Sequence, residues 1–314
     1  MTGELAAEVA QLCATGEDDL AIETGERLAA GAPNDVALRL RLGFVYGALE
    51  RFDAAFEHLD AAADVVGTRA EVFSQRANLE AFSGRGDARV SAARAIEIDP
   101  LQPQWVYFLA EHRLQGDFLI LDGAKVVCSP IPKSASTSLK RLFNQLEPDS
   151  DSVRAHQRFG GERLRSDRLR LAELDLNDFY RFAVVRDDLD RFVSYHRRNV
   201  MQSESLVRAG HGLDSYLGLS TRPSLDALAT KLAHYQYVFL DARHHTLPTR
   251  AYLHEDLDFY DDVFTIAEID ALAERLGTHT GTPLEIAHKL RSADDTPVEL
   301  SAESAAALTN YFGL

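Results

Sequence analysis

The chain contains few cysteines and no long apolar run. Its 314 residues include only two cysteines, Cys13 and Cys128, far apart in sequence. This usage is more typical of free thiols in a reducing compartment than of a disulfide framework, so we expect a cytoplasmic protein. No apolar run approaches the ~18 residues that a membrane helix needs. The first eight residues also lack the basic and apolar regions of a signal peptide. We therefore expect no membrane span.

Positive charge is also scarce. The formal net charge is −16, with 28 Arg but only 5 Lys, which disfavours general binding to nucleic acid. The charge is unevenly distributed: residues 1–115 hold 10 Arg against 19 acidic residues, whereas residues 153–198 hold 11 Arg against 8. An anionic ligand would therefore find its positive field in the second half of the chain.

Residues 1–115 predict an all-helical domain. Ala, Leu and Glu dominate there, and apolar residues recur at spacings of three and four. Pro33 and Pro100 each close a helix pair, at a separation close to two units of about 34 residues. The small residues Gly43, Ala55 and Ala62 occupy positions where paired helices must approach closely. This pattern resembles tetratricopeptide repeats (TPR), and a plain helical bundle is the alternative. In either case we assign this domain to packing or to binding a protein partner.

Residues 116–314 predict a second domain of mixed α/β class. Apolar strands are expected at 118–121, 125–129 and 179–185, with a further short strand at 250–254. The first two are joined by Asp-Gly, which is typical of a hairpin. Helices are expected at 136–147, 187–201 and 224–240, then near 267–276 and 301–312. Alternating strands and helices favour a largely parallel sheet with an anion site at the carboxyl ends of its strands.

The turn after the second strand has the composition of an anion site. Residues 130–138 read Pro-Ile-Pro-Lys-Ser-Ala-Ser-Thr-Ser. The first N–H groups of the following helix have no internal partner and can point at a bound anion. Lys133 adds a positive charge, and four hydroxyl groups add donors: Ser134, Ser136, Thr137 and Ser138. The Gly-x4-Gly-Lys-Ser/Thr pattern of nucleoside-triphosphate loops is missing, and with it the usual magnesium-binding hydroxyl. We therefore expect a phosphate-bearing donor that needs no metal.

A second cluster follows the third strand. Arg186 lies at the end of that strand, and Ser194 lies eight residues further along, on the next helix. An arginine fork and a hydroxyl at this separation can hold a second phosphate together. The chain thus offers two phosphate sites after two strands.

Together the two motifs resemble those of sulfotransferases that use 3′-phosphoadenosine 5′-phosphosulfate (PAPS). The branch they resemble is the carbohydrate sulfotransferases, which pair a Pro-x-Pro-Lys-x-x-x-Thr-Ser loop with an Arg-(Asp/Glu)-Pro-x-x-Arg-x-x-Ser-x-Tyr-Arg segment. Asp188 stands where that segment usually has proline. The resemblance implies a P-loop-like, parallel-sheet domain. It also implies that residues Lys133 to Ser138, Ala135 included, bind the 5′-phosphosulfate, and that Arg186 and Ser194 bind the 3′-phosphate. Arg291 lies in a late loop that closes over the nucleotide in the relatives.

The implied reaction is in-line transfer of a sulfuryl group to a hydroxyl of a carbohydrate or other small acceptor. Lys133 would neutralise charge on the leaving oxygen, and a general base would take the acceptor proton. His156, between the two motifs, is the first candidate base, and His254 with Glu255 is the second. No metal is expected.

Two other functions fit parts of the sequence. One is a repeat-based adaptor or scaffold whose second domain binds nucleotide without catalysis. The other is a kinase-like phosphoryl transferase, which would need magnesium and the glycine-rich loop that the sequence lacks.

Overall fold

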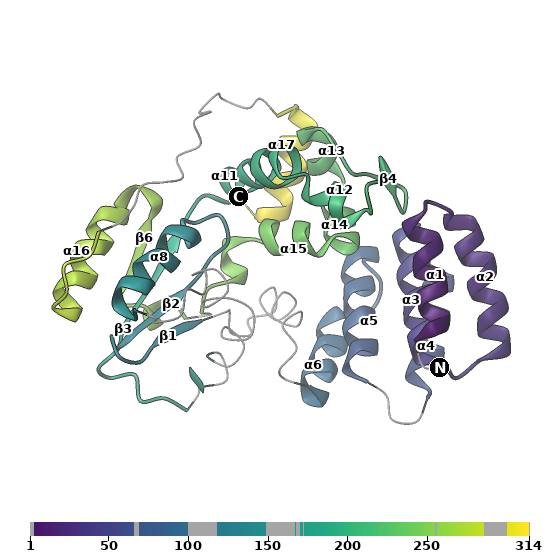
Figure 1. Cartoon of the computed structure of the whole chain (residues 1–314), viewed down its shortest axis with the longest axis horizontal. Helices are drawn as coiled ribbons and strands as arrows, with labels where there is room; N and C mark the ends of the chain where they lie inside the picture. The colour runs from purple at the N-terminus through teal and green to yellow at the C-terminus, as the bar shows by residue number, and fades with distance from the viewer. Residues whose placement is uncertain are drawn as a thin grey trace. The chain divides into compact units, whose positions relative to one another are not determined.

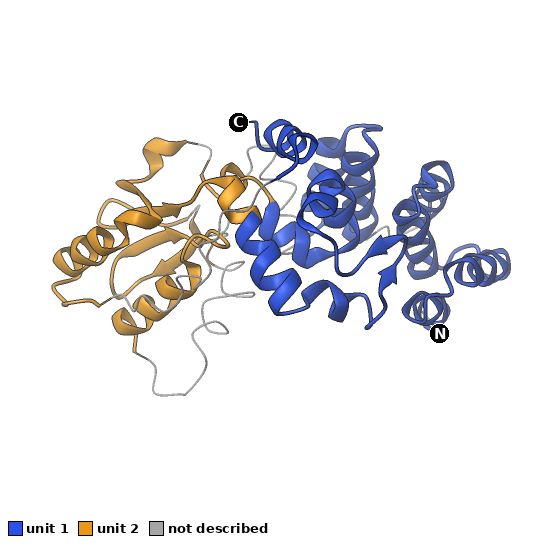
Figure 2. Ribbon diagram, turned by 90° about the horizontal axis from the view of Figure 1, so that it is seen from above, with its two compact units in different colours: residues 1–100, 193–246, 300–314 blue, residues 101–192, 247–299 orange. Residues whose placement is uncertain are grey.

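The structure of the chain, a computed structural model, describes residues 3–65, 69–99, 118–148, 167, 170–171, 173–254, 256–285 and 300–313 (Figure 1). The chain divides into two compact units (Figure 2). Unit 1 comprises residues 1–100, 193–246 and 300–314, and unit 2 comprises residues 101–192 and 247–299. These units interleave along the chain, whereas the predicted domains, 1–115 and 116–314, are continuous. Residues 193–246 and 300–314 group with the N-terminal helices.

Unit 1 begins with helices only, as the sequence predicts. The described N-terminal helices are α1 (Glu4–Ala14), α2 (Asp18–Gly31), α3 (Val36–Ala48), α4 (Phe52–Ala63), α5 (Ala70–Ser83) and α6 (Ala88–Ile98). The Asp35 carboxylate caps α3 by accepting the Leu38 N–H at 3.0 Å. A Cβ atom at Gly43 would lie 2.9 Å from the Leu59 side chain. The close approach of α3 and α4 therefore requires glycine at position 43.

The rest of unit 1 comes from the second half of the chain. Its elements are the last part of α11 (Asp188–Tyr195), a π-helix (His196–Gln202), α12 (Ser205–Ala209), β4 (Ser215–Tyr216), β5 (Leu219–Ser220), α13 (Leu225–Thr230), α14 (Leu232–Val238), α15 (Leu240–Thr246) and α17 (Ala302–Phe312). The prediction of one continuous helix over residues 224–240 is wrong. Ser224 caps α13 as predicted, but the backbone leaves helical geometry at Lys231, so α13 and α14 are separate helices.

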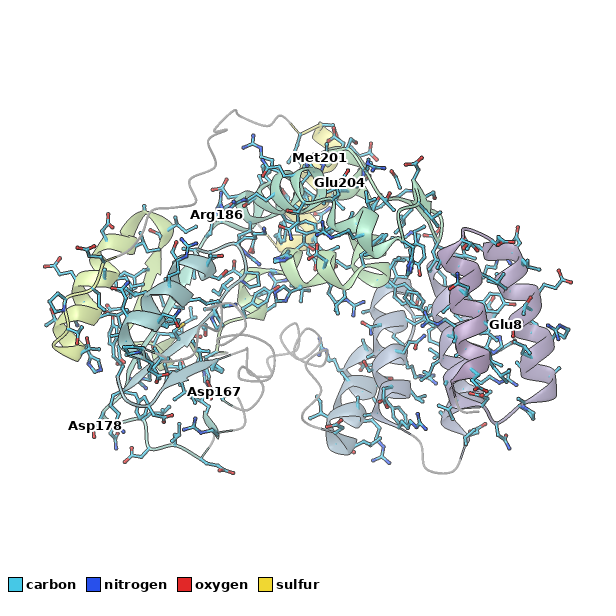
Figure 3. The ribbon with its side chains drawn as sticks, viewed as in Figure 1. Glu8, Asp167, Asp178, Arg186, Met201 and Glu204 are labelled. Atoms are coloured by element: carbon cyan, nitrogen blue, oxygen red, sulfur yellow. The ribbon has the colours of Figure 1, made fainter. Side chains whose placement is uncertain are left out.

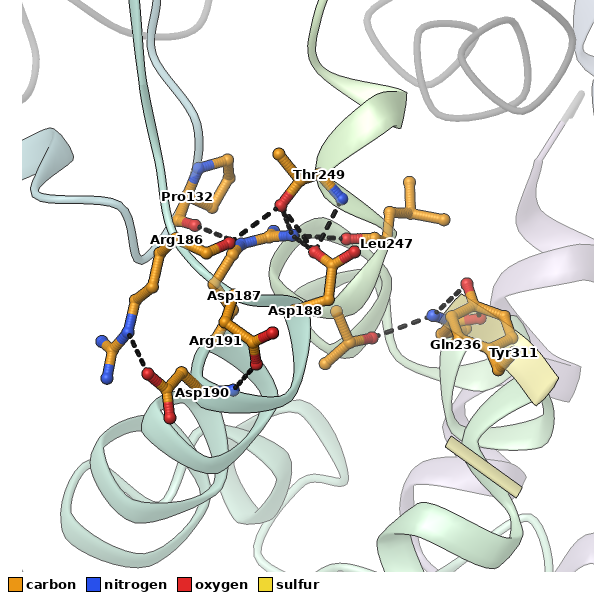
Figure 4. A network of polar contacts seen from close by, with 11 residues as sticks. Pro132, Arg186, Asp187, Asp188, Asp190, Arg191, Gln236, Leu247, Thr249 and Tyr311 are labelled. Carbon is orange, nitrogen blue, oxygen red and sulfur yellow. Dashed lines mark hydrogen bonds and ion pairs between the residues drawn. The ribbon is translucent and has the colours of Figure 1, made fainter. Parts of the chain in front are cut away.

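Helix α14 packs against α3 and α5 through aromatic rings. The Tyr237 ring stacks on Phe44 at 5.6 Å and on Phe82 at 5.0 Å between centroids. A Cβ atom at Gly47 would collide with the Tyr237 hydroxyl. Elsewhere in the unit, Gln236 of α14 donates a hydrogen bond to Tyr311 of α17 at 2.8 Å (Figure 4). The segments at residues 193–246 and 300–314 thus belong to the same compact unit as the N-terminal helices.

Unit 2 is built on a four-stranded sheet in the order β1-β2-β3-β6. Its elements are β1 (Leu119–Leu121), β2 (Val126–Ser129), α8 (Ser136–Leu146), β3 (Tyr180–Val185), the start of α11, two 3-10 turns (Thr249–Ala251 and Leu257–Phe259), β6 (Asp262–Thr265), a third 3-10 turn (Ile266–Glu268) and α16 (Ile269–Thr280). Strand β1 pairs antiparallel with β2, which confirms the hairpin, and β2, β3 and β6 are mutually parallel. The expected α/β class with a small parallel sheet is therefore present.

Alternate residues of the strands bury the two faces of this sheet. On one face, Cys128, Phe182 and Val184 pack with Leu142 of α8 and Leu276 of α16. The opposite face buries a second apolar cluster: Phe118, Ile120, Val127, Leu171, Phe179, Ala183 and Tyr260. Both faces are covered, so the short strands are apolar on both sides.

One predicted strand is wrong and one strand was missed. Residues 250–254 do not form a strand, because the Ala251 and Tyr252 N–H groups bond back to Pro248 and Thr249 and close a 3-10 turn. The fourth strand is instead β6, a short edge strand with alternating exposure. Its Asp-Val-Phe-Thr sequence carries little of the apolar signal that marks a buried strand. Within the described residues, no helix is long and apolar enough to cross a membrane.

Candidate functional site

The loop after β2 has a strained backbone. We call residues 130–138 the anion loop. Lys133 and Ala135 both adopt left-handed conformations, with φ of 64° and 56°, although neither is glycine. Between them, the Ser134 N–H closes a tight turn to the Ile131 carbonyl at 3.2 Å. Left-handed residues in such a turn can direct backbone N–H groups toward one side, as in an anion-binding nest.

Polar groups of the anion loop lie at the start of α8. Ala135 is the N-cap residue, and its methyl side chain cannot cap the helix. The Ser134 side chain is 0% exposed, yet its hydroxyl has no hydrogen-bond partner among the described residues. Lys133, Ser136, Thr137 and Ser138 are half-buried. A buried, unsatisfied hydroxyl beside uncapped helical N–H groups is a chemical environment suited to an anionic ligand.

Arg186 lies at the same edge of the sheet as the anion loop. Strands β2 and β3 are parallel, with Ser129 opposite Ala183, so both carboxyl ends reach this edge. Arg186 directly follows β3, and its side chain is 31% exposed. Its guanidinium lies 3.8 Å from the Asp190 carboxylate one helical turn further along (Figure 4). Figure 3 shows the Arg186 side chain in the context of the whole chain. Because this ion pair is long and the side chain is partly exposed, the guanidinium N–H groups of Arg186 can donate hydrogen bonds to a ligand.

Arg191 was not among the predicted site residues, yet it contacts the anion loop. This side chain is 1% exposed and donates from Nε to the Pro132 carbonyl at 3.0 Å. Its Nη1 donates to the Asp188 carboxylate and to the Leu247 carbonyl, both at 2.8 Å (Figure 4). The sequence places Arg191 in the second motif, but only burial distinguishes it from a surface arginine.

Ser194 lies on α11 and is half-buried. It belongs to unit 1, whereas Arg186 belongs to unit 2. Its pairing with Arg186 at a phosphate therefore stays a prediction.

His254 is tied to the end of β2 through Tyr260. The His254 N–H donates to the Tyr260 hydroxyl at 2.8 Å, and this hydroxyl lies 2.6 Å from the hydroxyl of Ser129, the last residue of β2. Burial raises the pKa of Tyr260 to about 12, so the phenol stays protonated at neutral pH and can donate to Ser129. The main chain at His254 is thus linked to the residue that precedes the anion loop.

The imidazole of His254 is held in place by its neighbours. The ring stacks on Phe259 with 4.4 Å between centroids. Its Nδ1 lies 3.1 Å from both the backbone oxygen and the backbone nitrogen of Asp256. Two tautomers fit these contacts: in the first, Nδ1 accepts from the Asp256 N–H and Nε2 carries the proton; in the second, Nδ1–H donates to the Asp256 oxygen and Nε2 is the basic nitrogen. The second tautomer leaves a proton acceptor on an oriented ring.

Three predicted site residues lie outside the described residues: His156, Glu255 and Arg291. Their roles stay predictions. Within the part of the chain that the structure describes, no group of three or more His, Cys, Asp or Glu residues could hold a metal ion.

Comparison with known proteins supports a sulfotransferase. A family model described as Sulfotransferase family matches residues 116–238, which include the anion loop, Arg186 and Ser194. This match supports sulfuryl transfer as the general chemistry of the domain. Searches of curated proteins and of solved structures found no match.

Proposed function

We propose that the chain transfers a sulfuryl group from PAPS to a hydroxyl of a carbohydrate or other small acceptor. The observation that carries the proposal is the anion loop, with its buried and unsatisfied Ser134 hydroxyl, at the same edge of the sheet as Arg186, which follows the neighbouring strand. The loop would hold the 5′-phosphosulfate through Lys133, its hydroxyl groups and its N–H groups. Arg186 would bind the 3′-phosphate, with Ser194 as its predicted partner, and Arg291 would belong to a loop over the nucleotide. The family match supports this assignment.

The chemical step balances without a metal or a redox partner. The acceptor oxygen attacks sulfur and forms a new S–O bond, while the bond from sulfur to the bridging oxygen breaks. The electron pair leaves on that oxygen, which stays with the 5′-phosphate of the nucleotide. Lys133 and the N-terminal N–H groups of α8 would stabilise this charge. The acceptor proton passes to a general base on the protein.

We propose His254 as that base, ahead of His156 and Glu255. Its backbone is connected through Tyr260 to Ser129, and its ring orientation is fixed by Phe259 and Asp256. In the tautomer that donates from Nδ1, Nε2 can receive the acceptor proton. A base that is oriented before the acceptor binds loses less entropy in the transition state.

We further propose that the N-terminal helices are TPR-type repeats and that they bind a protein partner. The close packing of α3 on α4 at Gly43 supports the repeats. We also propose that the protein is cytoplasmic. This proposal is supported by the two cysteines, Cys13 and Cys128, which are both buried and free.

The decisive experiment measures discrimination between two nucleotides. Calorimetry on the full chain would compare 3′-phosphoadenosine 5′-phosphate with adenosine 5′-phosphate, which lacks the 3′-phosphate. The wild type should prefer the first, and Arg186→Ala should remove most of this preference, about 10- to 100-fold, because a charge-assisted hydrogen bond contributes about 1.5–3 kcal/mol. Arg181→Ala is the matched control: it removes an arginine of β3, the strand that Arg186 follows, and the partner of Arg181 is Asp261. Equal affinity of the wild type for both nucleotides would refute the proposal.

Transfer itself can be tested with donor labelled in the sulfate group. The labelled donor would be screened against metabolites and glycans, with Lys133→Ala as the inactive control. Magnesium-dependent turnover of ATP in the same preparation would favour the kinase-like alternative instead.

A further inference from the structure

Arg191 is a buried cation whose hydrogen bonds reach three separate segments of unit 2. Its Nε bonds to the Pro132 carbonyl in the anion loop, and its Nη1 bonds to the Leu247 carbonyl at the start of the segment that leads to His254. The third segment is its own helix, where Nη1 meets the Asp188 carboxylate. The guanidinium also lies over the Tyr252 ring, 5.1 Å from the centroid. Figure 4 shows the hydrogen bonds to Pro132, Leu247 and Asp188 converging on the Arg191 side chain.

The bond to Pro132 lies at the entry to the strained part of the anion loop. The next residue, Lys133, is left-handed, and Ala135 is left-handed after it. Non-glycine residues hold such conformations only when the surrounding structure determines them. Ile131, on the other side of Pro132, is fully buried in a cluster with Leu247 and Tyr252. The loop is therefore fixed by an apolar contact before Pro132 and by the Arg191 guanidinium at Pro132.

Asp188 and Thr249 complete the arrangement. The Asp188 carboxylate accepts bonds from the Thr249 N–H at 2.7 Å and from the Thr249 hydroxyl at 2.5 Å, in addition to Arg191. The Thr249 hydroxyl also lies 3.2 Å from the Arg186 carbonyl. The carboxylate thus balances the buried charge of Arg191 and joins its helix to the turn at residue 249.

Only arginine can make this arrangement. Its planar fork directs Nε and Nη1 to different acceptors, whereas lysine carries a single ammonium group on a flexible stem. Lysine at this position would keep the charge for Asp188, but it could not hold the Pro132 and Leu247 carbonyls in the same geometry.

We infer that Arg191 is a positioning residue for the donor site: by holding the Pro132 carbonyl, it keeps the anion loop in the conformation that binds the 5′-phosphate group. Asp188 and Thr249 orient the guanidinium for this task. The inference rests on the proposed function and adds to it, because Arg191 need not touch the nucleotide.

The test uses the full chain, calorimetry and two nucleotides, 3′-phosphoadenosine 5′-phosphate and adenosine 5′-phosphate. Arg191→Lys should weaken binding of both by about 10- to 100-fold, since the loop that receives their shared 5′-phosphate loses a buried partner. The ratio of the two affinities should stay near the wild-type value, because Arg186 still reads the 3′-phosphate. Arg186→Ala should have the opposite signature and change mainly the ratio.

Two further variants separate positioning from folding. Thr249→Val removes one hydroxyl at nearly constant side-chain volume and should weaken binding of both nucleotides by about 3- to 10-fold. If Arg191→Lys fails to fold, this variant tests the positioning role instead. Arg243→Lys is the matched control in unit 1, because Arg243 is also buried and donates to the Gln236 carbonyl at 2.8 Å. It should lower the melting temperature and leave both affinities within about twofold, a shift too small for a lost hydrogen bond.

The outcomes are distinct. If the wild type binds the nucleotides and both Arg191→Lys and Thr249→Val bind them as tightly, the inference is overturned and the proposed function stands. If the folded wild type binds neither nucleotide, the proposed function fails, and this inference fails with it.

Discussion

The Ser134 hydroxyl provides the sharpest test of the anion loop. Ser129 and Ser134 lie five residues apart, and both side chains are 0% exposed. The Ser129 hydroxyl lies 2.6 Å from the Tyr260 hydroxyl, whereas the Ser134 hydroxyl has no partner in the described part of the chain. The same substitution, serine to alanine, should therefore have opposite effects on stability at the two positions.

The magnitudes follow from hydrogen bonding. A buried polar group without a partner costs about 1–3 kcal/mol, and a satisfied hydrogen bond contributes about 1 kcal/mol net. Ser134→Ala removes an unsatisfied group, so it should leave the free energy of unfolding unchanged or raise it by about 1 kcal/mol. Ser129→Ala leaves the buried Tyr260 hydroxyl without its Ser129 partner and should lower the free energy of unfolding by about 1–3 kcal/mol.

Ligand binding should respond to Ser134 in the direction opposite to stability. A hydroxyl that donates a hydrogen bond to a charged phosphate contributes about 1.5–3 kcal/mol to binding. Ser134→Ala should therefore weaken binding of 3′-phosphoadenosine 5′-phosphate by about 10- to 100-fold. Thermal unfolding and calorimetry on the same samples measure both effects. The reasoning is refuted if Ser134→Ala destabilises the chain as much as Ser129→Ala does and binds the nucleotide as tightly as the wild type.

Three further predictions address the base, the core of unit 1 and pH. His254→Gln should lower kcat by about 10²–10⁴-fold with little change in nucleotide affinity; an unchanged kcat would exclude His254 as the base. Tyr237→Ala should lower the free energy of unfolding by about 3–5 kcal/mol, because its ring stacks on Phe44 and Phe82; a loss below about 1 kcal/mol in denaturant unfolding would contradict this packing. Burial lowers the pKa of His234, so below the ordinary histidine pKa of ~6.5 the unfolded chain binds more protons than the folded chain, and the free energy of unfolding decreases as the pH is lowered, by up to about 1.4 kcal/mol per pH unit. His234→Gln should flatten this dependence in unfolding experiments between pH 7 and 5, and an unaltered slope would show that other groups cause it.

Much of the secondary structure could be read from local pattern. Strands were predicted at 118–121, 125–129 and 179–185 because each is a short apolar run, and the structure has strands at 119–121, 126–129 and 180–185. Helix α8 was predicted to follow the turn rich in small hydroxyl residues, and it begins within that turn, at Ser136. These signals are local, and neighbouring residues carry all of the information.

The errors occurred where distant contacts decide the conformation. Residues 250–254 have the composition of a strand, but the turn that begins at Thr249 is fixed by Asp188, far away in sequence. Strand β6 was missed because it has only four residues, none of them fully buried, and its two apolar residues are too few for the continuous apolar run of a buried strand. The single helix predicted over 224–240 is broken at Lys231, and the second part packs on α3 and α5.

The sequence by itself determined the α/β class of the second half, the helical nature of the first, and the two motifs that suggest a donor with separated anionic groups. Those conclusions depend on residue type and spacing, which are properties of the chain. Only the tertiary structure decided that Arg191 is buried against the Pro132 carbonyl, that the Ser134 hydroxyl is enclosed without a partner among the described residues, and that residues 193–246 share a core with the N-terminal helices. Burial and partnership depend on segments far apart in sequence, and no local pattern records them.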